Sequence, residues 1–205
     1  MNKVRITLAC TAVLSGAANA NLIVNGSFED SSLNPGGSWS VLGGGDTSID
    51  GWVTVGGGID YFGTIITASE GVHSVDLNNV SAGGGIMQTF DTNVGWLYTV
   101  EFDMSANMYG GPTPKVLRVH GGGDSADFEF DYVAAGATAL DPAWERMSWA
   151  FVATSSSTDL WFEGISTGVY GAALDNVVVT GVAPTPGTLA GFAAIGLVGS
   201  RRRRG

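Results

Sequence analysis

The chain has 205 residues and is poor in cysteine and in positive charge. Its single cysteine, Cys10, has no second cysteine with which to pair, so a disulfide framework within the chain is excluded. All nineteen acidic residues lie between positions 21 and 183, where only three residues, Lys115, Arg118 and Arg146, are basic, so this stretch has a net charge of −16. A field of that sign repels phosphate backbones and argues against nucleic acid as a partner, whereas cations and neutral ligands remain compatible. Solubility alone is the alternative reason for the acidity.

Long apolar runs are also scarce, and the first short one stands at the N-terminus. Lys3 and Arg5 precede an apolar run over residues 6–14, and small residues follow up to Ala20. A charged region, a short apolar region and an Ala-x-Ala site describe a secretory signal peptide, so residues 1–20 are predicted to be removed by cleavage after Ala20. A buried N-terminal helix is the alternative, because the run is too short to span a bilayer. The sequence therefore predicts export.

The C-terminus has three parts that a water-soluble core does not need. Residues 182–187 are linker-like and include Pro184 and Pro186, and an apolar stretch follows. Arginine then occupies four consecutive positions, Arg201, Arg202, Arg203 and Arg204. The apolar stretch is near the lower length limit for a membrane span. A spacer, an apolar segment and a basic cluster predict that residues 188–205 hold the chain at a membrane transiently.

The remaining stretch, residues 21–181, is predicted to be one folded domain without helices. It has no sustained apolar period of 3.6 residues, whereas residues 97–104, 126–132 and 147–151 alternate between apolar and mostly polar side chains. Further strands are expected at residues 22–24, 51–55, 59–62, 73–77, 85–90, 115–120, 159–165 and 172–180. Glycine triplets supply the turns between them. Roughly ten strands predict an all-β fold, a two-sheet antiparallel β-sandwich of the jelly-roll type.

Short motifs in a fixed order give the domain a family resemblance. It opens with Asn-Leu-Ile-Val-Asn-Gly-Ser-Phe-Glu-Asp at residues 21–30 and closes with Ala-Leu-Asp-Asn-Val-Val-Val at residues 173–179. Between them stand Ile-Asp-Gly-Trp at 49–52, Gly-Val-His-Ser-Val-Asp-Leu at 71–77 and Gly-Gly-Ile-Met-Gln-Thr-Phe at 84–90. This order resembles the choice-of-anchor C family of bacterial exported proteins. The resemblance implies a galactose-binding-domain-like jelly roll and a noncatalytic, glycan-directed role.

The tail resembles the PEP-CTERM sorting signal, which in its family directs processing by a membrane-embedded exosortase. Thr185 stands here between Pro184 and Pro186, where that family usually has glutamate. The resemblance implies an exosortase-like sorting protease and an extracellular or cell-surface polysaccharide as partners. It also implies a location at the cell surface or in the extracellular matrix.

Two acidic residues are candidate metal ligands. In jelly rolls of the resembled kind, a structural calcium commonly joins the first strand to the last through a glutamate and an aspartate, and the matching positions here are Glu29 and Asp175. Calcium takes about six to eight oxygen ligands, so backbone carbonyls and a side chain near residues 71–74 would have to complete the set. The alternative is that both carboxylates only accept hydrogen bonds in turns.

Sugar binding needs exposed aromatic rings. Tyr61, beside Asp60, and Tyr109, in a loop-like stretch, are the best candidates, and most other aromatic residues are expected in the core. Catalysis has less support, because the alternating carboxylates of Asp127, Glu129 and Asp131 fit a solvated strand face. The sequence thus predicts an exported, noncatalytic, carbohydrate-binding protein. The alternatives are a structural or protein-interaction surface protein without a small ligand and, third, a polysaccharide-processing enzyme.

Overall fold

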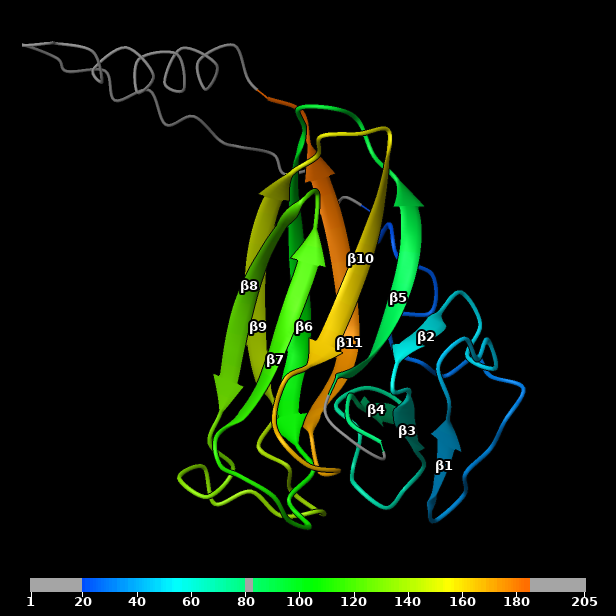
Figure 1. The fold of residues 1–205 in the computed structure, drawn as a ribbon, viewed down its shortest axis with the longest axis vertical. Helices are drawn as coiled ribbons and strands as arrows, with labels where there is room; N and C mark the ends of the chain where they lie inside the picture. Colours follow the sequence, from blue (N-terminus) through cyan, green and yellow to red (C-terminus); the bar gives the residue numbers. More distant parts are fainter. Residues whose placement is uncertain (1–19, 80–82, 185–205) are drawn as a thin grey trace, which may run out of the picture.

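The computed structural model describes residues 20–79 and 83–184, which fold into two β-sheets that lie face to face (Figure 1). The six-stranded sheet has the order β1 (Trp39–Leu42), β3 (Ile59–Phe62), β4 (Ser74–Asp76), β11 (Ala172–Val182), β6 (Leu97–Ala106) and β9 (Glu145–Val152). The five-stranded sheet has the order β2 (Val53–Gly56), β5 (Gly84–Asp91), β10 (Ser157–Gly164), β7 (Lys115–Gly121) and β8 (Asp124–Phe130). All pairings between these strands are antiparallel. The predicted all-β sandwich is confirmed.

The predicted strand positions agree with the structure except at the N-terminal end of the domain. Residues 22–24 form bends and turns, although the Leu22 N–H donates to the Val179 carbonyl at 2.9 Å and keeps this segment beside β11. The opening and closing motifs therefore lie side by side. Strand β1 was not predicted, because its two large apolar side chains, Trp39 and Val41, face solvent instead of the core.

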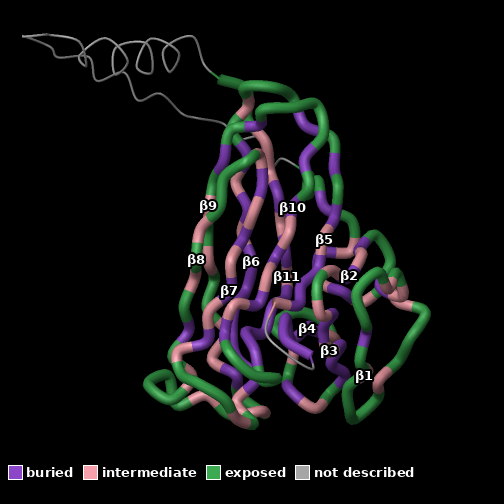
Figure 2. The backbone as a smooth tube through the Cα atoms, viewed as in Figure 1, coloured by how far each residue is buried: buried purple, intermediate pink, exposed green. Residues whose placement is uncertain are grey.

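The hydrophobic core fills the space between the two sheets. Along β6 the predicted inward face is confirmed, since Tyr98, Val100, Phe102 and Met104 are all buried. From β10, Leu160 and Phe162 meet them from the other sheet. Figure 2 shows the result as buried positions that alternate with more exposed ones along the long strands. Burial of one face per strand is what the period-two pattern requires.

The outer face of the six-stranded sheet is partly buried as well, which the alternation did not predict. The alternation of residues 97–104 places Asp103 of β6 on the polar, solvent-facing side, but only 8% of it is exposed. The loop of residues 63–73 crosses this face, and the Ser69 hydroxyl bonds to the Asp103 carboxylate. Arg146 of β9 bonds to the other Asp103 oxygen at 3.0 Å. A polar layer therefore lies between this loop and the sheet.

The two terminal segments lie largely outside the described residues. Residues 1–19 of the predicted signal peptide (residues 1–20) are outside them, as are Pro186 and the tail with Arg201, Arg202, Arg203 and Arg204. Ala20 and Pro184 are described, and both are exposed. Within the described part of the chain, no helix is long and apolar enough to cross a membrane.

Candidate functional site

A hollow lined by aromatic side chains lies where the short strands β1 and β3 meet two loops. We call it the aromatic cleft. Its volume is ≈ 630 Å³, which lies in the range of small-molecule sites. Strand β1 contributes Trp39 and β3 contributes Asp60 and Phe62, while the loops after β6 and β10 contribute Tyr109 and Tyr170. In Figure 1 the short strands β1, β3 and β4 gather beside the lower ends of the long strands.

Strand register explains the wall made by β1 and β3. Trp39 lies directly opposite Phe62, and Val41 lies directly opposite Asp60. The aromatic pair and the carboxylate of Asp60 are therefore neighbours on one face of the sheet. Trp39 is 49% exposed, Tyr109 56% and Tyr170 37%. Rings of this size are usually buried, so three of them exposed around one hollow are available for a ligand.

The two loops of the cleft are held by buried polar groups at the end of the sandwich. Asp76 of β4 is fully buried and accepts hydrogen bonds from Asn107 Nδ2 at 2.8 Å and from the Gly171 N–H at 3.0 Å. Lys115 Nζ, at the start of β7, donates to the carbonyls of Gly110 and Tyr170, both at 2.6 Å. One loop therefore binds the other through Asp76 and Lys115, which fixes the positions of Tyr109 and Tyr170.

Asp60 is the polar centre of the cleft wall. Its Oδ1 atom is buried and has no hydrogen-bond partner among the described residues. Burial raises the pKa of Asp60 to about 6, because water no longer solvates the charged form. Asp76 lies directly opposite on β4, and burial raises its pKa to about 7 despite three groups that donate to it. Burial lowers the pKa of Lys115, and the charge of Asp76 offsets part of this decrease.

The raised carboxyl pKa values predict that the domain is more stable in mild acid. The folded-state pKa of Asp60 and that of Asp76 exceed the usual 3.8, so the stability linked to their protons is present at low pH and lost as the pH rises through about 6 to 7. We expect the melting temperature to fall by roughly 5 °C between about pH 5 and pH 8. Thermal unfolding followed by circular dichroism measures this slope, and Asp60→Asn should make it shallower. A melting temperature that rises over this window would contradict the assignment.

The structure separates the two aromatic residues predicted to bind a ligand. Tyr109 lies in the cleft, as a binding role requires. The prediction for Tyr61 is wrong: it is fully buried, its hydroxyl donates to the Phe28 carbonyl at 2.8 Å, and its ring stacks on His73. Its neighbour Asp60 points to the opposite face of β3, because successive side chains alternate. Trp39 and Tyr170 were among the aromatic residues that the sequence could not place on the surface.

The two candidate calcium ligands reach the same loop from the two ends of the domain. Glu29 Oε1 accepts the N–H groups of Val72 and His73 at 2.7 Å each, and its Oε2 atom lies 3.0 Å from His73 Nδ1. Asp175 Oδ2 accepts the N–H groups of Ser69 and Glu70 at 2.7 and 2.9 Å. The opening and closing motifs are therefore joined through residues 69–73, which overlap the stretch of residues 71–74 that was expected to complete a metal site.

These contacts do not fit a calcium site as they stand. The carboxylate oxygens of Glu29 and Asp175 face N–H donors, whose positive ends occupy the space that a cation needs. Burial tends to raise the pKa of Glu29, but the N–H bonds from His73 and Val72 hold it below its usual value. Among the described residues, no group of three or more His, Cys, Asp or Glu side chains is placed to hold a metal. Hydrogen bonding to the loop is the role that the geometry favours, and calcium binding stays a prediction.

A melting experiment decides between the two roles. We expect the melting temperature to change by less than about 1 °C when about 1 mM calcium is replaced by a chelator, because the hydrogen bonds need no ion. Magnesium serves as the matched control for ionic strength. A rise of several degrees with calcium alone would show that the ion displaces the N–H donors and stabilises the folded domain.

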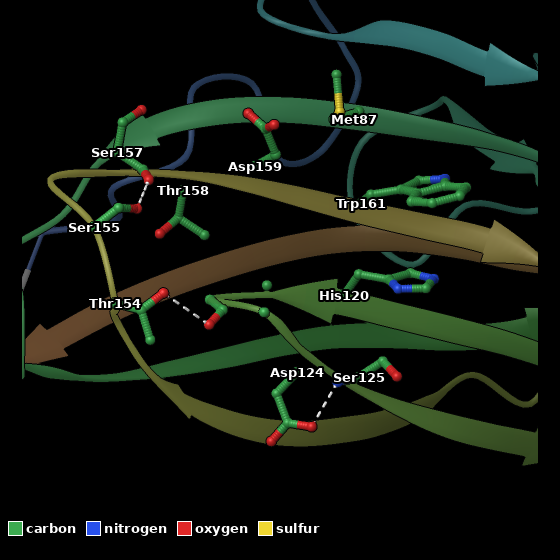
Figure 3. Close-up of a pocket in the computed structure, with 13 residues that line it drawn as sticks. Met87, His120, Asp124, Ser125, Thr154, Ser155, Ser157, Thr158, Asp159 and Trp161 are labelled. Carbon is green, nitrogen blue, oxygen red and sulfur yellow. Dashed lines mark hydrogen bonds between the residues drawn. The ribbon is translucent and has the colours of Figure 1, made fainter.

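A second hollow, ≈ 510 Å³ in volume, lies where the turn between β7 and β8 meets the loop before β10 (Figure 3). The rings of His120 and Trp161 stack there with centroids 4.4 Å apart, and His120 Nε2 lies 3.1 Å from Glu163 Oε2. The indole N–H edge presses against Gly85 of β5, where an added Cβ would lie 2.6 Å from Nε1. One ring face and one edge of Trp161 are thus occupied, so this hollow offers a ligand less free aromatic surface than the aromatic cleft does.

Comparisons with known proteins agree with the fold. The crystal structure of a cyclase from Fischerella sp. TAU superposes with a TM-score of 0.51 at 18% identity, over 80% of this chain and 97% of that one. A family 35 carbohydrate-binding module from Clostridium thermocellum has a TM-score of 0.47 at 14% identity, over 69% of this chain and 97% of that one.

One curated protein also matches in sequence. Halomucin from Haloquadratum walsbyi (strain DSM 16790 / HBSQ001) is 27% identical in an alignment of 187 residues that covers 85% of this chain. The chain spans only 2% of the length of Halomucin. A family description matches residues 21–180, from the opening motif to within two residues of the end of β11. On that match, the chain belongs to the family described as "Protein of unknown function (DUF642)".

Proposed function

We propose that this protein is an exported, noncatalytic carbohydrate-binding protein and that the aromatic cleft is its binding site. The observation that carries the proposal is the set of three exposed rings, Trp39, Tyr109 and Tyr170, around a hollow that also contains Asp60 and Asn107. The apolar C–H faces of a pyranose ring stack on aromatic rings, while carboxylate and amide groups bind its hydroxyls. Both kinds of group are present here on one concave surface.

The cleft supports binding rather than hydrolysis. Glycosidases of the common type use two carboxyl groups, one on each side of the bond that is cleaved. Among the described residues of the lining, Asp60 is the one carboxylate. Asp76 lies opposite it but is fully buried and bound by Asn107 and Gly171, so a substrate cannot reach it. The walls are also fixed by buried polar groups, which favours a preformed binding site.

Removing an exposed ring of the aromatic cleft should weaken glycan binding. We expect Tyr170→Ala and Trp39→Ala each to weaken the affinity for a bound glycan at least about tenfold, because each removes a stacking surface worth about 1.5 kcal/mol. Binding is measured on a glycan array and on polysaccharide from the organism that produces the protein, followed by calorimetry with the best ligand. Trp161→Ala in the second hollow is the matched aromatic control and should retain the affinity. Binding that is lost in Trp161→Ala but kept in the cleft variants would place the site in the second hollow.

Two outcomes would favour other roles. If no glycan binds the folded, full-length domain, a structural or protein-interaction role without a small ligand takes the place of our proposal. If a glycan is cleaved during the calorimetry, the protein is a polysaccharide-processing enzyme. Mass spectrometry of the recovered glycan detects cleavage directly.

Export and sorting are the second part of the proposal. The charged and apolar start of the chain and the tail from Pro184 to Arg204 support delivery through a membrane to the cell surface or the extracellular matrix, with an exosortase-like protease removing the tail. Cell fractionation and mass spectrometry of the mature termini test this part. We expect an N-terminus at Asn21 and the loss of the four terminal arginines, and a full-length chain in the cytoplasm would refute it.

A further inference from the structure

We propose that the aromatic cleft prefers a sugar unit with a positively charged amino group over the same unit with a neutral substituent. This inference rests on the proposed carbohydrate-binding function and specifies its ligand. It is carried by a carboxylate, that of Asp60, which lies among exposed aromatic rings and has no cationic partner in the described structure.

The basic side chains of the described residues are all committed elsewhere. Arg118 forms two hydrogen bonds with Asp127, and Arg146 bonds to Asp103 and to the Asn176 carbonyl. Lys115 donates to two loop carbonyls and is fully buried.

The two histidines are also engaged, His73 with Glu29 and His120 with Glu163. Within the described part of the chain, the cleft lining itself contains no Lys, Arg or His. The negative charge of Asp60 is therefore left for a ligand to neutralise.

The Asp60 carboxylate is the one charged group of the cleft lining among the described residues, so it defines where a cationic group of a ligand would bind. Its Oδ1 atom is buried and has no hydrogen-bond partner among the described residues, so no donor there offsets the charge in the free protein. A hydroxyl group could donate to the carboxylate, but it would leave the charge in place. An ammonium group would both donate and neutralise the charge, and such charge-assisted hydrogen bonds are about twice as strong as neutral ones.

The aromatic rings favour the same chemistry. Cations bind to the faces of Trp and Tyr rings, and cages of such rings recognise ammonium ligands. Trp39, Tyr109 and Tyr170 supply such rings beside Asp60. Ligands with carboxylate or sulfate groups are disfavoured, since the domain carries three basic against nineteen acidic residues.

Three hexasaccharides that differ only at C2 test the inference: chitosan hexaose with amino groups, its fully N-acetylated counterpart, and cellohexaose with hydroxyl groups. We expect the wild-type, full-length domain to bind the amino form about tenfold more tightly than the other two in calorimetry near pH 6.5. Asp60→Asn should bring the three affinities within about twofold of one another, because the amide keeps the size of the side chain and removes its charge.

A matched charge control separates the cleft from general attraction to an acidic protein. Asp91→Asn removes one exposed carboxylate at the end of β5, outside the cleft lining, and should keep the preference for the amino form. A preference that survives in Asp60→Asn, or that Asp91→Asn removes equally, would overturn the inference. If cellohexaose or another neutral glycan binds in the cleft as tightly as the amino form, the inference also fails while the proposed function stands. If no glycan binds at all, both fail.

Discussion

Replacing Lys115 by methionine is expected to lower the melting temperature by about 8 °C and to weaken glycan binding. Lys115 is fully buried, and its Nζ donates to the carbonyls of Gly110 and Tyr170 at 2.6 Å. Methionine has nearly the same length but cannot donate, so two carbonyls lose their partner and the buried charge of Asp76 loses its nearby cation. Removing one member of such a buried set costs about 3 kcal/mol, and each kcal/mol corresponds to about 2 to 4 °C for a domain of this size.

The effect on binding follows from the loops rather than from a contact with the ligand. Gly110 follows Tyr109, and the ring of Tyr170 packs so closely on Gly110 that an added Cβ would lie 2.8 Å from it. When Lys115 no longer holds both loops, the two tyrosines lose their fixed positions and binding must order them. We therefore expect affinity to fall even at temperatures where the variant is fully folded.

Arg118→Met is the control for the Lys115 substitution. It removes a positive charge three residues further along the same strand, but Arg118 is part of an exposed pair with Asp127, and exposed ion pairs contribute little to stability. Circular dichroism melts and calorimetry with the same glycan should show a near-wild-type protein. Equal changes of melting temperature and affinity in both variants would mean that net charge, and not the contact of Lys115 with both loops, determines the stability and the affinity of the domain.

The sandwich could be predicted from the sequence because one face of most strands is buried. The alternation in β6 puts Tyr98, Val100, Phe102 and Met104 on one side. Only one strand register buries all of these side chains, because a slip of one residue would turn them to the other face. The alternation does not indicate the structure where burial departs from this rule. Strand β1 has exposed apolar residues, since its outer side lines a cleft, and Asp103 is buried on the outer face because a loop that is far away in the sequence covers it.

The candidate site was harder to predict, because strands and loops that are distant in the sequence form it. Trp39 and Asp60 become neighbours in space only through the pairing of β1 with β3, and Tyr170 joins them only when Lys115 draws two loops together. Neither the pairing of β1 with β3 nor the contact between the loops produces a recognisable pattern in the local sequence. Tyr109 could be found since its loop contains glycine and proline, whereas Tyr61 was misplaced because period two puts it on the side opposite to its neighbour Asp60.

The motifs at the two ends of the domain were informative for a different reason. Glu29 and Asp175 were singled out as carboxylates that join the first segment to the last, and the structure does bring both to residues 69–73. The kind of bond they form was not predictable, because a carboxylate binds a metal ion and a backbone N–H with the same oxygen atoms. The partner depends on loop conformation, which residues 69–73 do not reveal by their composition.

Asp175→Ala is expected to destabilise the domain by about 3 kcal/mol. The Asp175 side chain is fully buried and accepts the N–H groups of Ser69, Glu70 and Asn176 at 2.7, 2.9 and 2.6 Å. Alanine leaves these donors without a partner beneath the loop. Each donor that water cannot reach then lowers the free energy of unfolding by about 1 to 3 kcal/mol. Relief of the repulsion with Asp103, which lies directly opposite on β6, offsets part of the loss.

The exposed residue Asp131 provides the matched control. It also accepts two backbone N–H groups, those of Val133 and Ala134 at 3.1 and 3.0 Å, and in addition the Thr113 hydroxyl at 2.7 Å. Because water can replace the Asp131 carboxylate, Asp131→Ala should cost less than about 1 kcal/mol in a urea unfolding experiment. If the two substitutions cost the same, burial under the loop is not what makes Asp175 important.

Hydrogen exchange locates the effect of Asp175→Ala within the fold. The amides of Ser69 and Glu70 should lose protection first, because their acceptor is gone, while those in the middle of β6 should follow only global unfolding. The same experiment separates the two roles considered for this carboxylate. If Asp175 bound calcium in solution, a chelator would reproduce the loss of protection in the wild-type protein, whereas a carboxylate that only accepts N–H groups leaves the wild-type pattern unchanged by the chelator. The loop would then be held to β11 by hydrogen bonds alone.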